Sequence, residues 1–90
     1  MEIISRKELL EKLDTKKGKV TKIKIEGEYM IQIFFSKFNY NLEEEILKMQ
    51  DLLRDSVISF CLNDVNFMGF ENEELICMLN DTKDTTIRIK

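Results

Sequence analysis

The chain has 90 residues, of which 43% are hydrophobic and 34% are charged, and its formal net charge is −3. This length and balance are typical of one globular domain with a single core, and they argue against a disordered chain. The chain contains no histidine and only two cysteines. Histidine is the commonest general base and metal ligand, and two cysteines alone cannot supply the four ligands of a zinc site.

A helix is predicted over residues 5–17. Ser5 and Glu8 have the spacing of a capping box, in which each side chain accepts a hydrogen bond from the backbone of the other. Gly18 suits the position just after a helix. The apolar residues of this segment recur at helical spacing and form one stripe: Leu9, Leu10 and Leu13.

Two strands are predicted next, over residues 19–26 and 29–38, with a turn at Gly27-Glu28 between them. The first strand alternates lysine with isoleucine and is expected to be half buried. The second is apolar on both faces, which predicts a central strand that is covered on both sides. Its expected core face contains Tyr29, Ile31, Ile33 and Phe35, and its other face contains Met30, Phe34 and Phe38.

A second helix is predicted over residues 41–54. Asn41 can cap its first turn, which also contains acidic residues that favour the positive end of a helix dipole. Four apolar residues then recur at a spacing that places them on one helical face: Leu42, Ile46, Met49 and Leu53.

The rest of the chain is predicted to be mainly strands, over residues 56–62, 65–70, 74–79 and 85–89. Gly69 suggests a bulge or bend in the second of these. Residues 74–79 also fit a short helix capped by Asn72, but the turn signals on both sides favour a strand. Residues 80–84 are predicted to form a polar turn.

These elements predict an α+β fold in a single compact domain of residues 1–90. We expect two helices packed on one face of a largely antiparallel sheet of five to six strands, in the order α-β-β-α-β-β-β(-β).

The residue types predict no enzyme. Without histidine, Ser-His and Cys-His nucleophile pairs are excluded, and the three glycines are too far apart to form a phosphate-binding loop. Two carboxylate clusters, Asp81-x-x-Asp84 and Glu71-x-Glu73-Glu74, lack the spacing and glycine of a calcium loop. We therefore expect no catalytic residues, no cofactor and no metal.

One candidate surface for binding a partner protein combines apolar and acidic residues near Gly69. If these side chains are exposed, they would form an apolar anchor with an acidic rim, and if they are buried they belong to the core, which is the interpretation that we favour for the apolar ones. The residues are Phe67, Met68, Phe70, Glu71, Glu73 and Glu74.

A second candidate is a basic segment that could follow the phosphates of single-stranded nucleic acid while nearby aromatic rings stack on bases. Against this, lysines on a strand also protect a sheet edge from aggregation, and the whole chain is acidic. The basic residues are Lys16, Lys17, Lys19, Lys22 and Lys24, and the aromatic residues are Tyr29, Phe34, Phe38 and Tyr40.

Cys61 and Cys77 lie in apolar stretches and are expected to be free thiols. No apolar run approaches the roughly 20 residues that span a bilayer, so we expect a cytoplasmic protein with no membrane contact. With 11 lysines, 11 isoleucines and no alanine or proline, the composition suits an AT-rich genome, such as a low-GC bacterium, phage or mobile element.

The sequence therefore favours a non-catalytic protein-interaction domain, suited to a small accessory or inhibitor protein. Its partner would be another protein, and self-association through an edge strand is also expected. The alternative is weak binding of single-stranded nucleic acid through the Lys16–Lys24 face.

Overall fold

The computed structural model describes residues 1–80 and 84–90, and these residues form nine strands, one α-helix and one short 3-10 helix. In chain order the elements are β1 (Glu2–Ile3), α1 (Arg6–Asp14), β2 (Thr21–Glu26), β3 (Met30–Phe35), β4 (Phe38–Glu43), β5 (Ile46–Asp51), β6 (Val57–Cys61), η1 (Leu62–Asp64), β7 (Val65–Glu71), β8 (Glu74–Leu79) and β9 (Thr86–Ile89).

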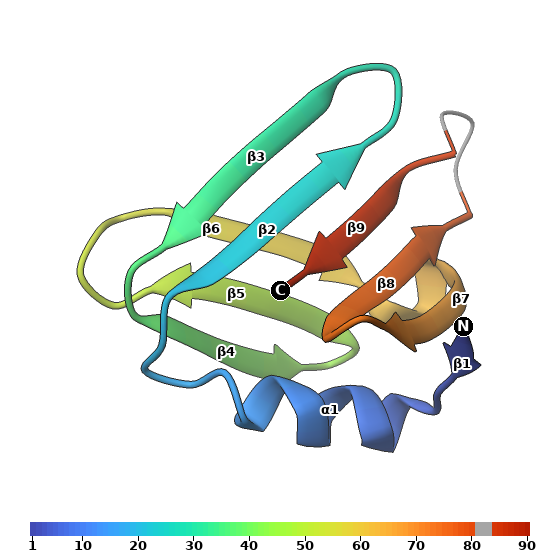
Figure 1. The fold of residues 1–90 in the computed structure, drawn as a ribbon, viewed down its shortest axis with the longest axis horizontal. Helices are drawn as coiled ribbons and strands as arrows, with labels where there is room; N and C mark the ends of the chain where they lie inside the picture. The colour runs from blue at the N-terminus through green and yellow to red at the C-terminus, as the bar shows by residue number, and fades with distance from the viewer. Residues whose placement is uncertain (81–83) are drawn as a thin grey trace.

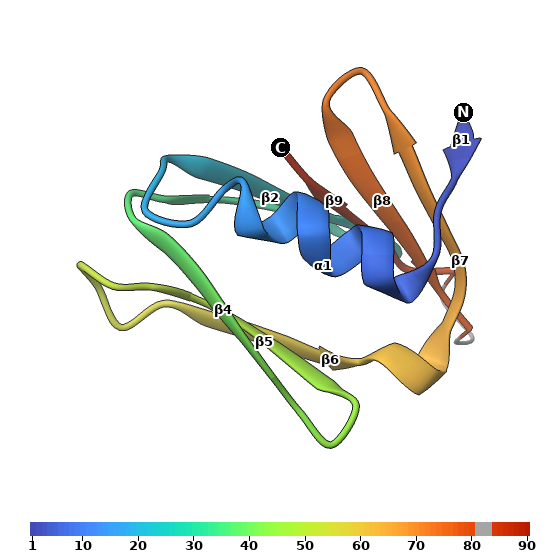
Figure 2. The same cartoon turned by 90° about the horizontal axis from the view of Figure 1, so that it is seen from below.

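Within the described residues the strands form two antiparallel sheets. One has six strands in the order β1-β7-β8-β9-β2-β3, and the other has three in the order β4-β5-β6. Strands of the larger sheet cross over those of the smaller one (Figure 1), and α1 runs along one side of the pair (Figure 2). The core lies where α1 and the inner faces of the two sheets meet, because buried residues from all three form one cluster.

Helix α1 begins as predicted and ends three residues early. The capping box of Ser5 and Glu8 is present, and Leu9 and Leu13 are buried. After Asp14 the backbone tightens, since Lys16 N–H donates to the carbonyl three residues back at Leu13. Gly18 then adopts a positive φ of 76°, a conformation that glycine reaches without steric cost.

The prediction of a second helix over residues 41–54 is wrong, because this segment contains the β4–β5 hairpin. Glu44 and Glu45 form its two-residue turn, with φ values of 49° and 73°. From Phe38 onward, alternate side chains of β4 face the core while Asn39 and Asn41 face away. This alternation every two residues is that of a strand with one buried face. Burial of the core-facing side chains of β4 outweighs the local helical preference of the glutamates.

The expectation that the second strand is central and covered on both sides is also wrong. β3 is the last strand of the larger sheet in the described residues, and β2 is its neighbour. Of the predicted core face, Phe35 is buried and Ile33 is partly buried, but Tyr29 and Ile31 are exposed. β9, from the end of the chain, pairs with the other side of β2, so β2 has a neighbouring strand on each side and β3 has one.

The strands predicted over 19–26, 56–62, 65–70, 74–79 and 85–89 match β2, β6, β7, β8 and β9 to within two residues, and residues 74–79 form a strand, not a helix. The short strand β1 was not predicted. The irregularity expected at Gly69 lies between Val65 and Phe67. Gly69 is instead a close-packing point, where an added Cβ would lie 2.6 Å from Met1 Sδ. The predicted polar turn at 80–84 includes residues 81–83, which lie outside the described residues.

The α+β class is therefore confirmed, and its finer description is corrected. The described residues contain one α-helix and two sheets, where two helices on a single sheet were predicted. Both cysteines are free thiols as expected, and burial raises the pKa of Cys77 to about 12.

Candidate functional site

The open edge of β3 is the feature of this molecule that most resembles a binding surface. No strand in residues 1–80 or 84–90 pairs with the side of β3 that faces away from β2. Large apolar side chains along it are exposed to 78% at Tyr29, 64% at Met30, 51% at Ile31 and 54% at Phe34. An exposed run of this kind is unusual, because natural proteins commonly cover or protect the edges of their sheets.

The hydrogen bonds between β2 and β9 show in which direction the N–H and C=O groups of each β3 residue point. Lys90 N–H donates to the carbonyl oxygen of Lys22 at 2.8 Å, so the polar groups of Lys22 face β9. In an antiparallel ladder this direction alternates from one residue to the next, so the backbone polar groups of Ile23 point toward β3. Those of its partner Ile33 point back toward β2. The N–H and C=O groups of the alternate β3 residues, Met30, Gln32 and Phe34, therefore point out of the open edge.

The β3 edge lacks the usual devices that discourage strand pairing. Its residues, Met30–Phe35, include no charge, no proline and no glycine. The opposite edge of the same sheet is β1, which has only two residues and offers little to pair with. The two edges of the larger sheet therefore differ sharply in their capacity to accept another strand.

Asp51 fixes the corner at which the chain leaves β3 and enters β4. Its buried carboxylate accepts backbone hydrogen bonds from Ser36 at 2.9 Å, Leu53 at 3.0 Å and Lys37 at 3.1 Å. Burial alone would raise the pKa of Asp51, but the three donors outweigh it and the pKa is lowered overall. The carboxylate stays charged and holds the end of β3 in place, so the open edge is presented by a fixed backbone.

The charged groups next to β3 lie on the face of β2 that points away from the core. Lys22 is opposite Phe34 and Lys24 is opposite Gln32 in the strand register. Arg88 on β9 binds Glu26, and it binds Glu74 at 3.0 Å. The hydrogen bonds that Arg88 donates to Glu26 and then to Glu74 raise the pKa of Arg88, so its charge is compensated within the sheet. Lys22 and Lys24 remain beside the edge.

The structure separates the five lysines of the predicted basic segment. Lys22 and Lys24 lie on β2, whereas Lys16, Lys17 and Lys19 lie in the connection between α1 and β2. Lys17 pairs with Asp14 at 3.2 Å. Burial lowers the pKa of Lys16, against the attraction of Glu73.

Two of the predicted aromatic partners are unavailable for stacking on bases. Phe38 is fully buried. Tyr40 packs against the core, and its hydroxyl lies 2.5 Å from Asp14 Oδ1. Phe34 is the predicted ring that shares a face with Lys22 and Lys24, since it lies opposite Lys22 in the register.

The predicted apolar and acidic patch is also divided between two faces of the sheet. Met68 and Phe70 pack against the core, and the ammonium of Lys12 lies 3.9 Å from the centre of the Phe70 ring. Phe67 lies on the other face, where its ring approaches Gly69.

The three acids of that patch take different positions around the β7–β8 hairpin. Glu71 lies 3.6 Å from the N-terminal amine, and Glu74 binds Arg88. Glu73 occupies the turn with a φ of 66°. They therefore do not form a continuous rim around an apolar anchor.

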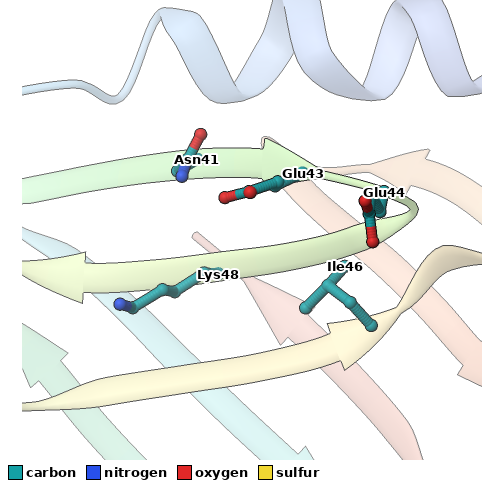
Figure 3. Close-up of a pocket in the computed structure, with 5 residues that line it drawn as sticks. All are labelled: Asn41, Glu43, Glu44, Ile46 and Lys48. Atoms are coloured by element: carbon teal, nitrogen blue, oxygen red, sulfur yellow. The ribbon is translucent and has the colours of Figure 1, made fainter.

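A shallow depression lies on the outer face of the smaller sheet (Figure 3), with a volume of about 260 Å³. Its lining comes from β4, β5 and the turn between them: Asn41, Glu43, Glu44, Ile46 and Lys48. Ligand pockets are usually larger and enclosed by several elements. A depression formed by one hairpin is a weaker candidate than the β3 edge.

Three observations complete the description of the site. Within the described ranges, no group of three or more His, Cys, Asp or Glu side chains is arranged as metal ligands would be. The helices of that same part of the chain are too short or too polar to cross a membrane. Comparisons of the chain with protein-family models, curated proteins and solved structures give no match.

Sequence reasoning missed the β3 edge as a site, although its signal is present. A strand that is apolar on both faces was interpreted as covered on both sides. The same pattern, combined with six consecutive uncharged residues from Met30 to Phe35, also fits an edge that awaits a partner.

Proposed function

We propose that this chain is a non-catalytic protein-interaction domain that binds its partner by adding a strand to the open edge of β3. The observation that carries the proposal is the exposed, uncharged edge from Met30 to Phe35. In strand addition, main-chain hydrogen bonds supply affinity and the alternating side chains supply specificity. The proposal assigns no catalytic residue, cofactor or metal, and it suits a small accessory or inhibitor protein.

Both faces of the added strand would find apolar contacts. Met30, opposite Glu26, and Phe34, opposite Lys22, project from the outer face. Ile31 and Ile33 project from the inner face. Docking would remove exposed apolar area from water at about 25 cal/mol per Å². It would also satisfy the outward groups of Met30, Gln32 and Phe34.

The test replaces Phe34 by lysine and compares it with a matched control. Phe34→Lys places a charge at the edge, where the incoming strand would bury it. Val57→Lys also replaces an exposed apolar residue by lysine, but on β6 in the other sheet, and Val57 is about as exposed as Phe34 (50% against 54%). Tagged wild-type chain and both variants are incubated with lysate of the encoding organism, and retained proteins are identified by mass spectrometry.

We expect a partner that the wild type and Val57→Lys retain and that Phe34→Lys loses. Circular dichroism and thermal melting check that both variants are folded. Retention of the same proteins by folded Phe34→Lys as by the wild type would contradict the proposal.

A second candidate function is weak binding of single-stranded nucleic acid, because Lys22, Lys24 and Phe34 share one face next to the edge. A salt series with a fluorescent oligonucleotide tests this candidate. Affinity that falls about one log unit per phosphate contact for each log unit of salt would support it, and no binding at low salt would end it.

A further inference from the structure

We infer that the strand added to β3 is β3 of a second copy of this chain, paired antiparallel about Gln32. The inference rests on the proposed function, because it uses the same open edge, and it goes further by naming the partner and the register. The resulting dimer would join two six-stranded sheets into one continuous sheet across a two-fold axis.

The register follows from the alternation of the β3 backbone. Only Met30, Gln32 and Phe34 direct their polar groups outward, so these residues must pair with one another in the second copy. Centring the two-fold axis on Gln32 uses all three residues in both copies. Gln32 then lies opposite Gln32, and Met30 lies opposite Phe34 on each side of it.

The side chains are self-complementary in this register. On the outer face, two contacts between a methionine and a phenylalanine flank a pair of amides that can bond to each other. On the inner face, Ile31 lies opposite Ile33 of the second copy in both directions. Met30, Gln32 and Phe34 form an apolar, polar, apolar series in either direction. Two antiparallel copies therefore place apolar residues opposite apolar ones and Gln32 opposite Gln32.

Charge favours the antiparallel direction. Glu28 precedes β3 and Lys37 follows it, and both are exposed. Antiparallel pairing places the Glu28 end of each copy beside the Lys37 end of the other. Parallel pairing of two copies would place like charges together at both ends, which is unfavourable.

A closed dimer also accounts for the unprotected edge. A single copy leaves β3 open, with a six-residue uncharged run that favours uncontrolled strand pairing. In the two-fold dimer each β3 covers the other, and the outer edge of each sheet becomes the two-residue β1. The joined sheet therefore offers little to the β3 of a third copy.

The first experiment measures mass by sedimentation at chain concentrations up to about 1 mM. Wild type is expected to dimerise as concentration rises. Gln32→Pro removes an outward N–H and leaves the β2–β3 ladder intact, so it should stay monomeric and folded. The control Val57→Lys should dimerise as wild type does.

The second experiment tests the register by disulfide cross-linking in a Cys61→Ser background, where the remaining Cys77 is fully buried. Gln32→Cys should cross-link with itself, since directly opposed Cα atoms lie about 5.5 Å apart. Phe34→Cys alone should not, because its two copies would be about 14 Å apart along the strands. A mixture of Phe34→Cys and Met30→Cys should cross-link.

The outcomes separate this inference from the proposed function. A wild type that stays monomeric to about 1 mM, or a dimer that Gln32→Pro leaves intact, overturns the inference. If the chain is monomeric but loses a lysate protein in Phe34→Lys, the proposed function stands with a different partner. If Phe34→Cys alone cross-links and Gln32→Cys does not, the register is wrong and the inference is overturned.

Discussion

At the scale of single residues, Tyr40 ties β4 to α1. Its hydroxyl lies 2.5 Å from Asp14 Oδ1 and 3.2 Å from the Leu10 carbonyl oxygen. Both of these acceptors for the hydroxyl proton belong to α1. Burial, followed by the hydrogen bond to Asp14, raises the pKa of Tyr40 to about 12. The same hydrogen bond, followed by that from Lys17, lowers the pKa of Asp14.

We therefore expect Tyr40 to ionise late in the native protein. The chain contains two tyrosines, so Tyr29→Phe leaves Tyr40 as the sole reporter in an ultraviolet titration. The midpoint should be about 12 in the native protein. It should be about 10 in denaturant.

The sign of the linked stability effect follows from these values. The folded pKa lies above the unfolded one, so the contribution of Tyr40 is complete below pH 10 or so and is lost as the pH rises toward 12. Asp14→Asn removes the neighbouring negative charge and should lower the native midpoint. A native midpoint near 10 in the Tyr29→Phe chain would show that the burial of Tyr40 and its contact with Asp14 are both absent in solution.

At the scale of elements, the β4–β5 turn decides the fold of the middle of the chain. Glu44 and Glu45 both adopt positive φ, as in the tight turns that suit the twist of a hairpin. Neither is a favoured residue for that conformation, which costs a residue with a side chain about 1 kcal/mol. Glu45 also binds Arg6 on α1, and this contact links the turn to the helix.

Glu44→Gly distinguishes the hairpin from the helix that the sequence suggests. In the hairpin, relief of the left-handed strain exceeds the entropic cost of glycine, and unfolding should become harder by about 0.5 kcal/mol, or about 3 °C in Tm. In a helix the same change would cost about 1 kcal/mol. Thermal melting followed by circular dichroism gives the sign, and a lower Tm would contradict the hairpin.

The elements also show what the sequence could predict. The capping box of Ser5 and Glu8 and the alternation of residues 21–26 are local signals, and both were interpreted correctly. The β4–β5 hairpin was missed because Glu44 and Glu45 give no turn signal, although the alternation of Asn39 and Asn41 with apolar residues was present. Over so few residues the same apolar pattern fits both a helix and a strand, and burial of one face of the hairpin in the core decides for the strand.

At the scale of the whole molecule, the position of β3 could not be predicted from its own residues. Strand order depends on pairing between β2, in the first third of the chain, and β9, at its end. That pairing occupies one side of β2 and leaves β3 at the edge. The acidic and basic segments that were expected to form sites are instead divided between different faces and elements, so the site proposed here rests on the position of β3 in the sheet.

Residue-by-residue amide exchange, followed by NMR as chain concentration or added partner increases, tests whether the β3 edge is where binding occurs. In the free monomer, the outward amides of Met30, Gln32 and Phe34 should exchange quickly, and those of Ile31 and Ile33 should be protected. On binding, the three outward amides should become protected as well. Persistently fast exchange at these three positions in the bound state would contradict strand addition at β3.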